Sequence, residues 1–242
     1  MKHHLQILFT SRLCMLMLIP LLTFVQPPRS AAAVWILADD YSLSANPSGR
    51  WSFGSSLVPG QDFTLMPKAH PQPRQTSGGV CAGWGGTSES VGIDGAEILP
   101  FIHKCSGDPK KYTTILGMLS APFPAIRVRN GSVFVHPDGI GSYAVIRWVA
   151  PKSADYSIFV SCYNVDLITG ATTNLIVLRN AEKIAEGSVS GFQGMTYFSP
   201  PNSILPLKSG DVLEFAIGNG GNGFHSDSTG VDIVIRTLDP RL

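Results

Sequence analysis

The stretch Gly230-Val231-Asp232-Ile233-Val234-Ile235-Arg236-Thr237-Leu238 lies close to the end of the chain and decides the fold class. Every second residue from Val231 to Ile235 is β-branched and apolar. Asp232 and Arg236 belong to the alternate set, so one face of the extended chain is apolar and the other is mixed. A period of two is that of a β-strand with one buried face. The stretch therefore predicts a strand over residues 230–238.

The same alternation recurs upstream, in short segments separated by clusters of Gly, Pro and Asn. The longest example is Asp155-Tyr156-Ser157-Ile158-Phe159-Val160-Ser161-Cys162-Tyr163. The other predicted strands are residues 34–38, 51–53, 63–66, 132–135, 143–149, 172–178, 183–186, 195–198 and 211–217. No long window has the i, i+3, i+4, i+7 apolar spacing of a helix. This spacing of short strands predicts an all-β fold, a two-sheet antiparallel sandwich with a jelly-roll-like layout.

Two segments of the first half are less regular. Residues 68–94 are predicted to be loop-like, because they combine prolines with a dense run of glycines. Long loops inside a compact domain often carry function. Residues 110–118 have the length of a short helix, but their Tyr, Thr and Ile content favours a strand.

The first residues have the pattern of a secretory signal. Lys2 and Arg12 precede a short apolar run, and small residues end the segment at Ala33. The run is shorter than the roughly 20 residues that span a bilayer. We therefore expect residues 1–33 to be a signal peptide cleaved after Ala33, and residues 34–242 to be a single β-sandwich domain. The mature chain is expected to be secreted or periplasmic, with no membrane contact after cleavage.

The charge balance excludes two classes of partner. Loss of Lys2, Arg12 and Arg29 with the signal leaves 15 basic residues against 17 acidic ones. A net charge of about −2 is not the footprint of a nucleic-acid-binding protein or of a polybasic membrane anchor. Charged residues form only 14% of the chain, which is low for a globular domain and suits a β-rich extracellular surface.

Three cysteines remain once Cys14 is removed with the signal: Cys81, Cys105 and Cys162. In an oxidising compartment an odd number leaves one thiol unpaired. The sequence favours a Cys81–Cys105 disulfide, since both residues lie in turn-rich sequence, with Cys162 as a small core residue. All three pairings remain open on the sequence alone.

Three motifs point to a known group of domains. Residues 46–54, Asn-Pro-Ser-Gly-Arg-Trp-Ser-Phe-Gly, resemble the opening "NPNGxWSYG" of secreted bacterial β-sandwich domains, of the kind found in PEP-CTERM-type exported proteins. Residues 136–151 resemble their "HPG…VVRWTAP" segment, with Asp138 in place of the glycine. Residues 209–230 resemble their "GDxIDF…GGNG…DSTG" ending. The resemblance implies a layout similar to jelly-roll carbohydrate-binding modules. It implies neither an activity nor surface retention, because the sorting tail of these proteins is missing.

The segment of residues 218–230 is unusual in composition. Asn219, Asn222, His225 and Asp227 place amide, imidazole and carboxylate groups among glycines, as a sugar-binding or calcium-binding loop requires. The same residues are also those of a wide turn, because Asn and Gly accept left-handed backbone conformations. Both interpretations stay open.

Calcium is the cofactor for which the sequence offers ligands. Asp227 and Asp232 would provide carboxylates, joined by Asp39 or Asp40 if the first and last strands lie together. Calcium takes about six to eight oxygen ligands, so carbonyl groups would have to complete the shell. No EF-hand or repeat-type calcium motif is present, and otherwise no cofactor is expected.

Exposed aromatic rings would stack on sugars. Trp84 lies among glycines and is the first candidate, with Tyr163 and Tyr197 at strand ends as additions. No catalytic residue is assigned: Val189 stands where a nucleophile elbow needs serine, and the histidines are scattered without HExxH or CxxC spacing.

The function predicted from the sequence is a secreted, non-catalytic, carbohydrate-binding-like module. The alternatives are an extracellular structural or adhesive surface protein and a hydrolase of unrecognised type. The expected partners are a glycan or the extracellular matrix, without nucleic acid.

Overall fold

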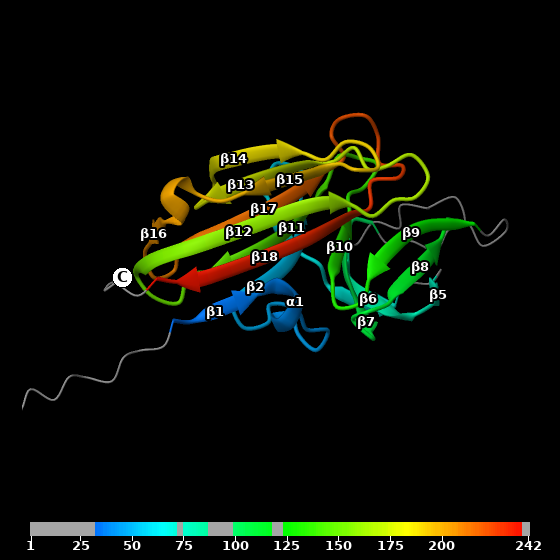
Figure 1. The fold of residues 1–242 in the computed structure, drawn as a ribbon. Coiled ribbons are helices and arrows are strands. Elements are labelled where there is room, and N and C mark those ends of the chain that lie inside the picture. Colours follow the sequence, from blue (N-terminus) through cyan, green and yellow to red (C-terminus); the bar gives the residue numbers. More distant parts are fainter. Residues whose placement is uncertain (1–31, 72–74, 87–98, 118–122, 239–242) are drawn as a thin grey trace, which may run out of the picture. The chain divides into compact units, whose positions relative to one another are not determined.

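The computed structural model describes residues 32–71, 75–86, 99–117 and 123–238 (Figure 1). In this part of the chain strands predominate, and all neighbouring strands are antiparallel. The predicted all-β sandwich is confirmed. None of the helices in these residues is long and apolar enough to cross a membrane.

The first sheet has nine strands. Their order is β15 (Met195–Phe198), β12 (Ala154–Asn164), β18 (Thr229–Thr237), β10 (Val133–His136), β7 (Phe101–Gly107), β6 (Gly79–Gly85) and β4 (Lys68–Pro71), with β1 (Val34–Ile36) also paired to β18 and β16 (Leu205–Leu207) to β12. The long strands β12 and β18 run side by side (Figure 1). They are the two stretches in which the alternation of the sequence is most regular.

The second sheet faces the first across the main core. Its six strands are β14 (Glu182–Ser188), β13 (Asn174–Arg179), β17 (Val212–Gly218), β11 (Tyr143–Val149), β2 (Trp51–Ser56) and β3 (Thr64–Leu65). Trp51, Trp148 and Phe215 from this sheet share the core with Val231 and Ile233 of β18. The apolar face predicted for residues 230–238 is therefore the buried face.

A third sheet of β5 (Gln75–Ser77), β8 (Tyr112–Leu116) and β9 (Pro124–Arg129) packs on a second core cluster. Ile115 and Val128 come from this small sheet, whereas Phe101 and Phe134 come from β7 and β10 of the first sheet. The preference for a strand over residues 110–118 agrees with β8, while β7 and β9 were not predicted.

The loop-like prediction for residues 68–94 is wrong for β4, β5 and β6, and its residues 72–74 lie outside the described residues. Glycines usually weaken a strand, but at Gly83 the missing side chain is what permits the pairing. A Cβ atom there would lie 2.0 Å from the carbonyl oxygen of Ile102 and 2.4 Å from Cδ2 of His103. This part of the glycine-rich segment is thus a strand, and at Gly83 the adjacent strand β7 leaves no room for a side chain. Residues 87–94 of the same prediction lie outside the described residues.

Hydrogen bonds connect the first strand β1 to the last strand β18. Ala33 donates its N–H to Thr237 Oγ1 and accepts from the Thr237 N–H, both at 2.9 Å, so the pairing of β1 with β18 starts there. The chain then turns into a short helix α1 (Leu37–Asp40), whereas a strand was predicted as far as residue 38. Residues 1–31 of the predicted signal peptide lie outside the described residues.

Candidate functional site

Trp84 does not offer a ring for stacking. Its side chain is only 6% exposed and belongs to the main core, and its indole N–H donates to the carbonyl oxygen of Ser42 at 2.9 Å. The prediction of an exposed stacking ring is therefore wrong. The glycines around Trp84 do not mark a surface turn, since the ring sits on the buried strand β6.

The glycine-rich loop after β17 is tied to a second loop by hydrogen bonds. Thr172 donates to Asp227 Oδ1 from its N–H and from Oγ1, both at 2.9 Å. Asn222 donates from Nδ2 to Thr172 Oγ1 at 3.0 Å, and Asn219 accepts from the N–H of Gly221. His225 stays exposed, with its ring 4.4 Å from that of Phe224. These contacts hold the glycine-rich loop against the loop that contains Thr172.

Asp227 was expected to point to solvent or to an ion if the loop binds a ligand, but the structure buries it completely. Burial raises the pKa of this carboxyl, the hydrogen bonds from Thr172 lower it, and the nearby Asp166 raises it further. Its Oδ2 atom has no hydrogen-bond partner among the described atoms. Asp227 therefore holds the loop in place at a desolvation cost.

The predicted calcium ligands are not gathered at one point. Asp227 is influenced by Asp166 and His225, whereas Asp232 lies near Arg129. In the described part of the chain, no three or more His, Cys, Asp or Glu side chains form a group that could hold a metal. The strands β1 and β18 do pair, as the calcium prediction required, but Asp40 Oδ2 there accepts from Trp51 Nε1 at 3.0 Å.

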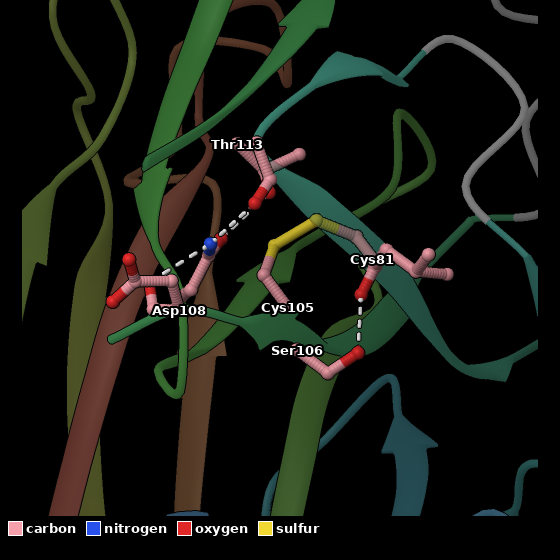
Figure 2. Close-up of a disulfide and its surroundings, with 8 residues drawn as sticks. Cys81, Cys105, Ser106, Asp108 and Thr113 are labelled. Carbon is pink, nitrogen blue, oxygen red and sulfur yellow. Dashed lines mark hydrogen bonds between the residues drawn. A yellow bond between two sulfur atoms is a disulfide. The ribbon is translucent and has the colours of Figure 1, made fainter. Parts of the chain in front are cut away.

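Cys81 and Cys105 form a disulfide, the pairing that the sequence favours (Figure 2). The bond joins β6 to β7. Thr113 lies close to it in Figure 2 and donates from Oγ1 to the buried Asn130 Oδ1 at 2.7 Å. Asn130 Nδ2 donates to the carbonyl oxygens of Gly78 and Asp108. The disulfide thus cross-links two neighbouring strands of the first sheet. The Asn130 amide connects Thr113 of the third sheet to the segments beside these two strands.

Cys162 is a free, buried thiol, as expected for a core residue. Burial raises its pKa to about 12, with the charge of Asp232 adding to the effect. A thiol with so high a pKa is nearly all protonated at neutral pH and is a poor nucleophile.

A concave surface opens between the third sheet and the loop that follows β12. We call it the aromatic cleft; it has a volume of about 410 Å³ and is lined by Tyr112, Arg127, Asn164, Val165, Asp166, Leu167 and Phe192. Two aromatic rings are exposed within it, that of Tyr112 at 46% and that of Phe192 at 60%. The volume falls within the range of about 300–1,000 Å³ found for small-molecule sites.

The guanidinium group of Arg127 packs on the ring of Tyr112 at the aromatic cleft. Its guanidinium carbon lies 4.6 Å from the centre of the Tyr112 ring, a cation–π geometry. Arg127 and Arg129 project from the same face of β9, because they are two residues apart on one strand. In the described residues neither arginine forms an ion pair with a carboxylate. Arg129 donates from Nε to the carbonyl oxygen of Pro109 at 2.9 Å, so its terminal N–H groups and the guanidinium of Arg127 are the donors that a ligand could use.

The other polar residues of the aromatic cleft are already occupied. Asn164 Oδ1 accepts from the N–H groups of Asp166 and Ala171, and its Nδ2 donates to the carbonyl oxygen of Phe192 at 3.3 Å. Asp166 Oδ1 accepts from the N–H of Ile168 at 2.7 Å. These two residues thus shape the loop and place Phe192, and Arg127 supplies the donors that a ligand in the aromatic cleft could use.

A second, adjoining cleft of about 570 Å³ shares Tyr112, Arg127, Asn164 and Val165 with the aromatic cleft. It adds Arg129, Tyr163 and Asp232. Burial raises the pKa of Tyr163 to about 12, and the charge of Asp232 also raises it. Burial likewise raises the pKa of Asp232, and Arg129 opposes this shift. A neutral phenol beside an arginine provides further hydrogen-bond donors.

Tyr163, which the sequence indicated as an addition, lines this adjoining cleft, and Tyr197 does not line either cleft. Tyr112, Arg127 and Phe192 were missed. The only signal for them in the sequence is weak, since aromatic and basic residues at outward-facing positions of strands or turns are common. The three residues also come from three segments that the sequence gives no reason to bring together.

No protein-family model matches the chain, and no curated protein matches it. Among solved structures it is similar to a CBM51 module from a Clostridium perfringens GH95 protein in complex with methyl-galactose, at 15% identity and a TM-score of 0.33 over 70% of this chain and 100% of that chain. The M60 catalytic domain with the CBM51-1 and CBM51-2 domains of Clostridium perfringens ZmpB is matched at 13% identity and a TM-score of 0.36, over 71% of this chain and 20% of that one.

The CBM51-2 domain of the same ZmpB protein, in complex with GlcNAc and with INT domains, is matched at 10% identity and a TM-score of 0.35. That likeness covers 75% of this chain and 45% of the other. Similarity at this level carries no inference about what this chain binds.

Proposed function

We propose that this chain is a non-catalytic binding module whose ligand is a saccharide, bound in the aromatic cleft. The observation that carries the proposal is the presence of two exposed rings, Tyr112 and Phe192, in one concave surface with the donor Arg127. A sugar ring has apolar C–H faces that pack on aromatic rings and hydroxyl groups that need fixed polar partners. The cleft provides both.

The contacts around the cleft support its being formed before a ligand arrives. The Tyr112 ring limits the movement of Arg127, and Asn164 fixes the backbone at Phe192. Groups that are already in position lose less entropy on binding. The adjoining cleft, with Arg129 and Tyr163, provides room for a second sugar unit.

The proposal includes export of the chain. Its support is the signal pattern of residues 1–33 and the disulfide between Cys81 and Cys105, a bond that persists in oxidising compartments. Mass spectrometry of the protein recovered outside the cytoplasm should find an N-terminus at Val34. A mature protein that retains residues 1–30 would contradict export by this signal.

A glycan array tests the ligand class, with the wild-type protein beside Phe192→Ala and Tyr197→Ala. Both substitutions remove an exposed ring, but only the first ring lines the cleft. We expect the dissociation constant of the best saccharide to rise about tenfold in Phe192→Ala, equivalent to about 1.4 kcal/mol, and to stay unchanged in Tyr197→Ala. Absence of any saccharide binding by the wild-type protein would overturn the proposal.

A second candidate function is that of an adhesive surface protein, and one observation favours it. Tyr197 is 73% exposed on β15, opposite Ser161 of β12, and Met195 opposite Tyr163 is also exposed. With Phe159 they form an apolar outer face on the first sheet. If binding is lost in Tyr197→Ala and kept in Phe192→Ala, the binding site is this outer face and not the aromatic cleft.

Hydrolysis is the remaining alternative, and Asp232 is the residue to examine. A carboxyl with a raised pKa in a cleft is what a general acid requires. We expect no release of reducing ends when the bound saccharide is incubated with the protein. Release that disappears in Asp232→Asn would identify a glycosidase instead.

A further inference from the structure

His70 and His103 come together across Gly83. His70 on β4 is aligned with Gly83 on β6, which is aligned with His103 on β7. The two imidazole rings meet edge to face with their Nε2 atoms 3.5 Å apart. This contact exists because Gly83 has no side chain: a Cβ atom there would lie 2.4 Å from Cδ2 of His103. Histidines that the sequence scatters are thus paired by the sheet.

The hydrogen bonds indicate which nitrogen of His70 has a free lone pair. Its Nδ1 lies 3.2 Å from the carbonyl oxygen of Pro71, which can only accept a hydrogen bond. Nδ1 therefore carries the proton, and Nε2 presents its lone pair to His103. A carbonyl acceptor on the far nitrogen is also the usual surroundings of a metal-binding histidine. His103 differs in this respect, because its Nδ1 is buried with no hydrogen-bond partner among the described atoms.

The separation of the two Nε2 atoms is long for a hydrogen bond between them, which has a typical range of about 2.7–3.2 Å. Two nitrogens at about 2.0–2.1 Å from a tetrahedral Zn²⁺ ion would be about 3.4 Å apart. The observed distance of 3.5 Å between His70 and His103 is close to that value.

Burial favours the neutral form of both rings, which is the ligand form of histidine. Burial lowers the pKa of His103 well below its usual value, and the proximity of His70 lowers it further. Burial also lowers the pKa of His70, with Lys68 contributing and the bond to Pro71 opposing. The His103 ring is held in place by stacking on Phe101, with ring centres 4.2 Å apart.

We propose that His70 and His103 bind one divalent cation of the zinc class through their Nε2 atoms. In the described residues no third His, Cys, Asp or Glu joins them, so solvent completes the coordination. The site differs from the aromatic cleft, and neither histidine lines it. A bound cation would join the edge strand β4 to β7 and would leave coordination positions open to an external ligand.

Zinc binding by the full chain tests the proposal. All proteins carry His3→Gln and His4→Gln, so that the N-terminal histidines contribute nothing, and Zn²⁺ is titrated in competition with a chromophoric chelator. We expect one equivalent bound at the site, with an affinity at least tenfold lower in His70→Gln and unchanged in the matched control His225→Gln. His70 is half-buried on an edge strand, so the variant should fold, which a circular dichroism melt without metal verifies.

A zinc affinity that is equal in the His70→Gln and parent proteins would overturn the proposal, and so would absence of zinc binding up to millimolar concentration. Pulsed electron paramagnetic resonance with Cu²⁺ gives a second readout, which does not depend on affinity. Two coordinated imidazoles are expected in the parent and one in His70→Gln. A single imidazole in the parent would rule out the shared site.

Discussion

The sandwich and the aromatic cleft beside β8 and β9 differ in how far their aromatic rings are exposed to solvent. Trp51, Trp148 and Phe215 are buried between the two large sheets, with at most 1% of their surfaces exposed. Tyr112 and Phe192 are about half exposed and line a cleft. On the proposed function, substitutions in the main core should lower the stability of the protein, whereas substitutions of exposed cleft residues should lower its affinity for a saccharide.

The largest effect is expected from Phe215→Ala in the sandwich. Truncating a fully buried phenylalanine removes apolar contacts and leaves a cavity, and typically costs about 3–5 kcal/mol of unfolding free energy. Urea denaturation measures the loss. Saccharide affinity, measured at a temperature where the variant is folded, should be unchanged. A large drop in affinity without loss of stability would remove the distinction between the regions.

The disulfide should have the next largest effect. Its cysteines are 24 residues apart, and closing a loop of this length stabilises a protein by about 3 kcal/mol in the chain-entropy model. The double variant Cys81→Ala, Cys105→Ala should lose stability of this order in urea denaturation. Peptide mapping without reductant serves as the control for the pairing, and a bridge that includes Cys162 would contradict it.

Asp227→Ala tests whether the glycine-rich loop has a structural role or binds calcium. Its two hydrogen bonds from Thr172 would be lost, so we expect a decrease of about 1–3 kcal/mol in the unfolding free energy. Thermal melts with and without calcium should show the same decrease. Stabilisation of the wild type by calcium that is absent in Asp227→Ala would restore the ion-binding interpretation.

The pH dependence of the same residue has a definite sign. Burial raises the folded-state pKa of Asp227, so the native state binds this proton more tightly than the unfolded chain does. The contribution of Asp227 to stability is therefore most favourable below its unfolded pKa of about 3.9, and it declines as the pH rises through the raised native pKa. Asp227→Asn cannot ionise and should not show this decline.

The smallest effect on stability is expected from Arg127→Ala. Because its side chain is exposed, stability should change by less than about 0.5 kcal/mol. The dissociation constant of the saccharide should rise about tenfold. Arg127→Lys is the matched control, since it keeps the charge but loses the planar group that lies on Tyr112. Equal affinity in all three proteins would exclude Arg127 from the site.

The fold was accessible from the sequence where one face of a strand is buried. The alternation in β12 and β18 is visible because one set of residues meets the core, namely Tyr156, Ile158, Val160, Val231, Ile233 and Ile235. Most of the residues between them are more exposed. The prediction failed at β6, where Gly83 is required by the close approach of Ile102 and His103 on the next strand. A contact between strands leaves no local pattern in the sequence.

The site was less accessible for the same reason. The loop that contains Asp227 has the composition of a binding loop. However, the hydrogen-bond partner of Asp227 is Thr172, 55 residues away, and this bond holds the carboxylate in the interior. Tyr112, Arg127 and Phe192 lie on separate segments, and only the packing of the third sheet brings them into one cleft. Spacing along the chain carries no information about such a site.

Chemical-shift mapping of the backbone amides with the best saccharide from the array tests the central claim most directly. We expect the largest shifts at Tyr112, Arg127 and Phe192, with little change at residues 219–227. Shifts centred on residues 219–227, with none at the cleft, would contradict it.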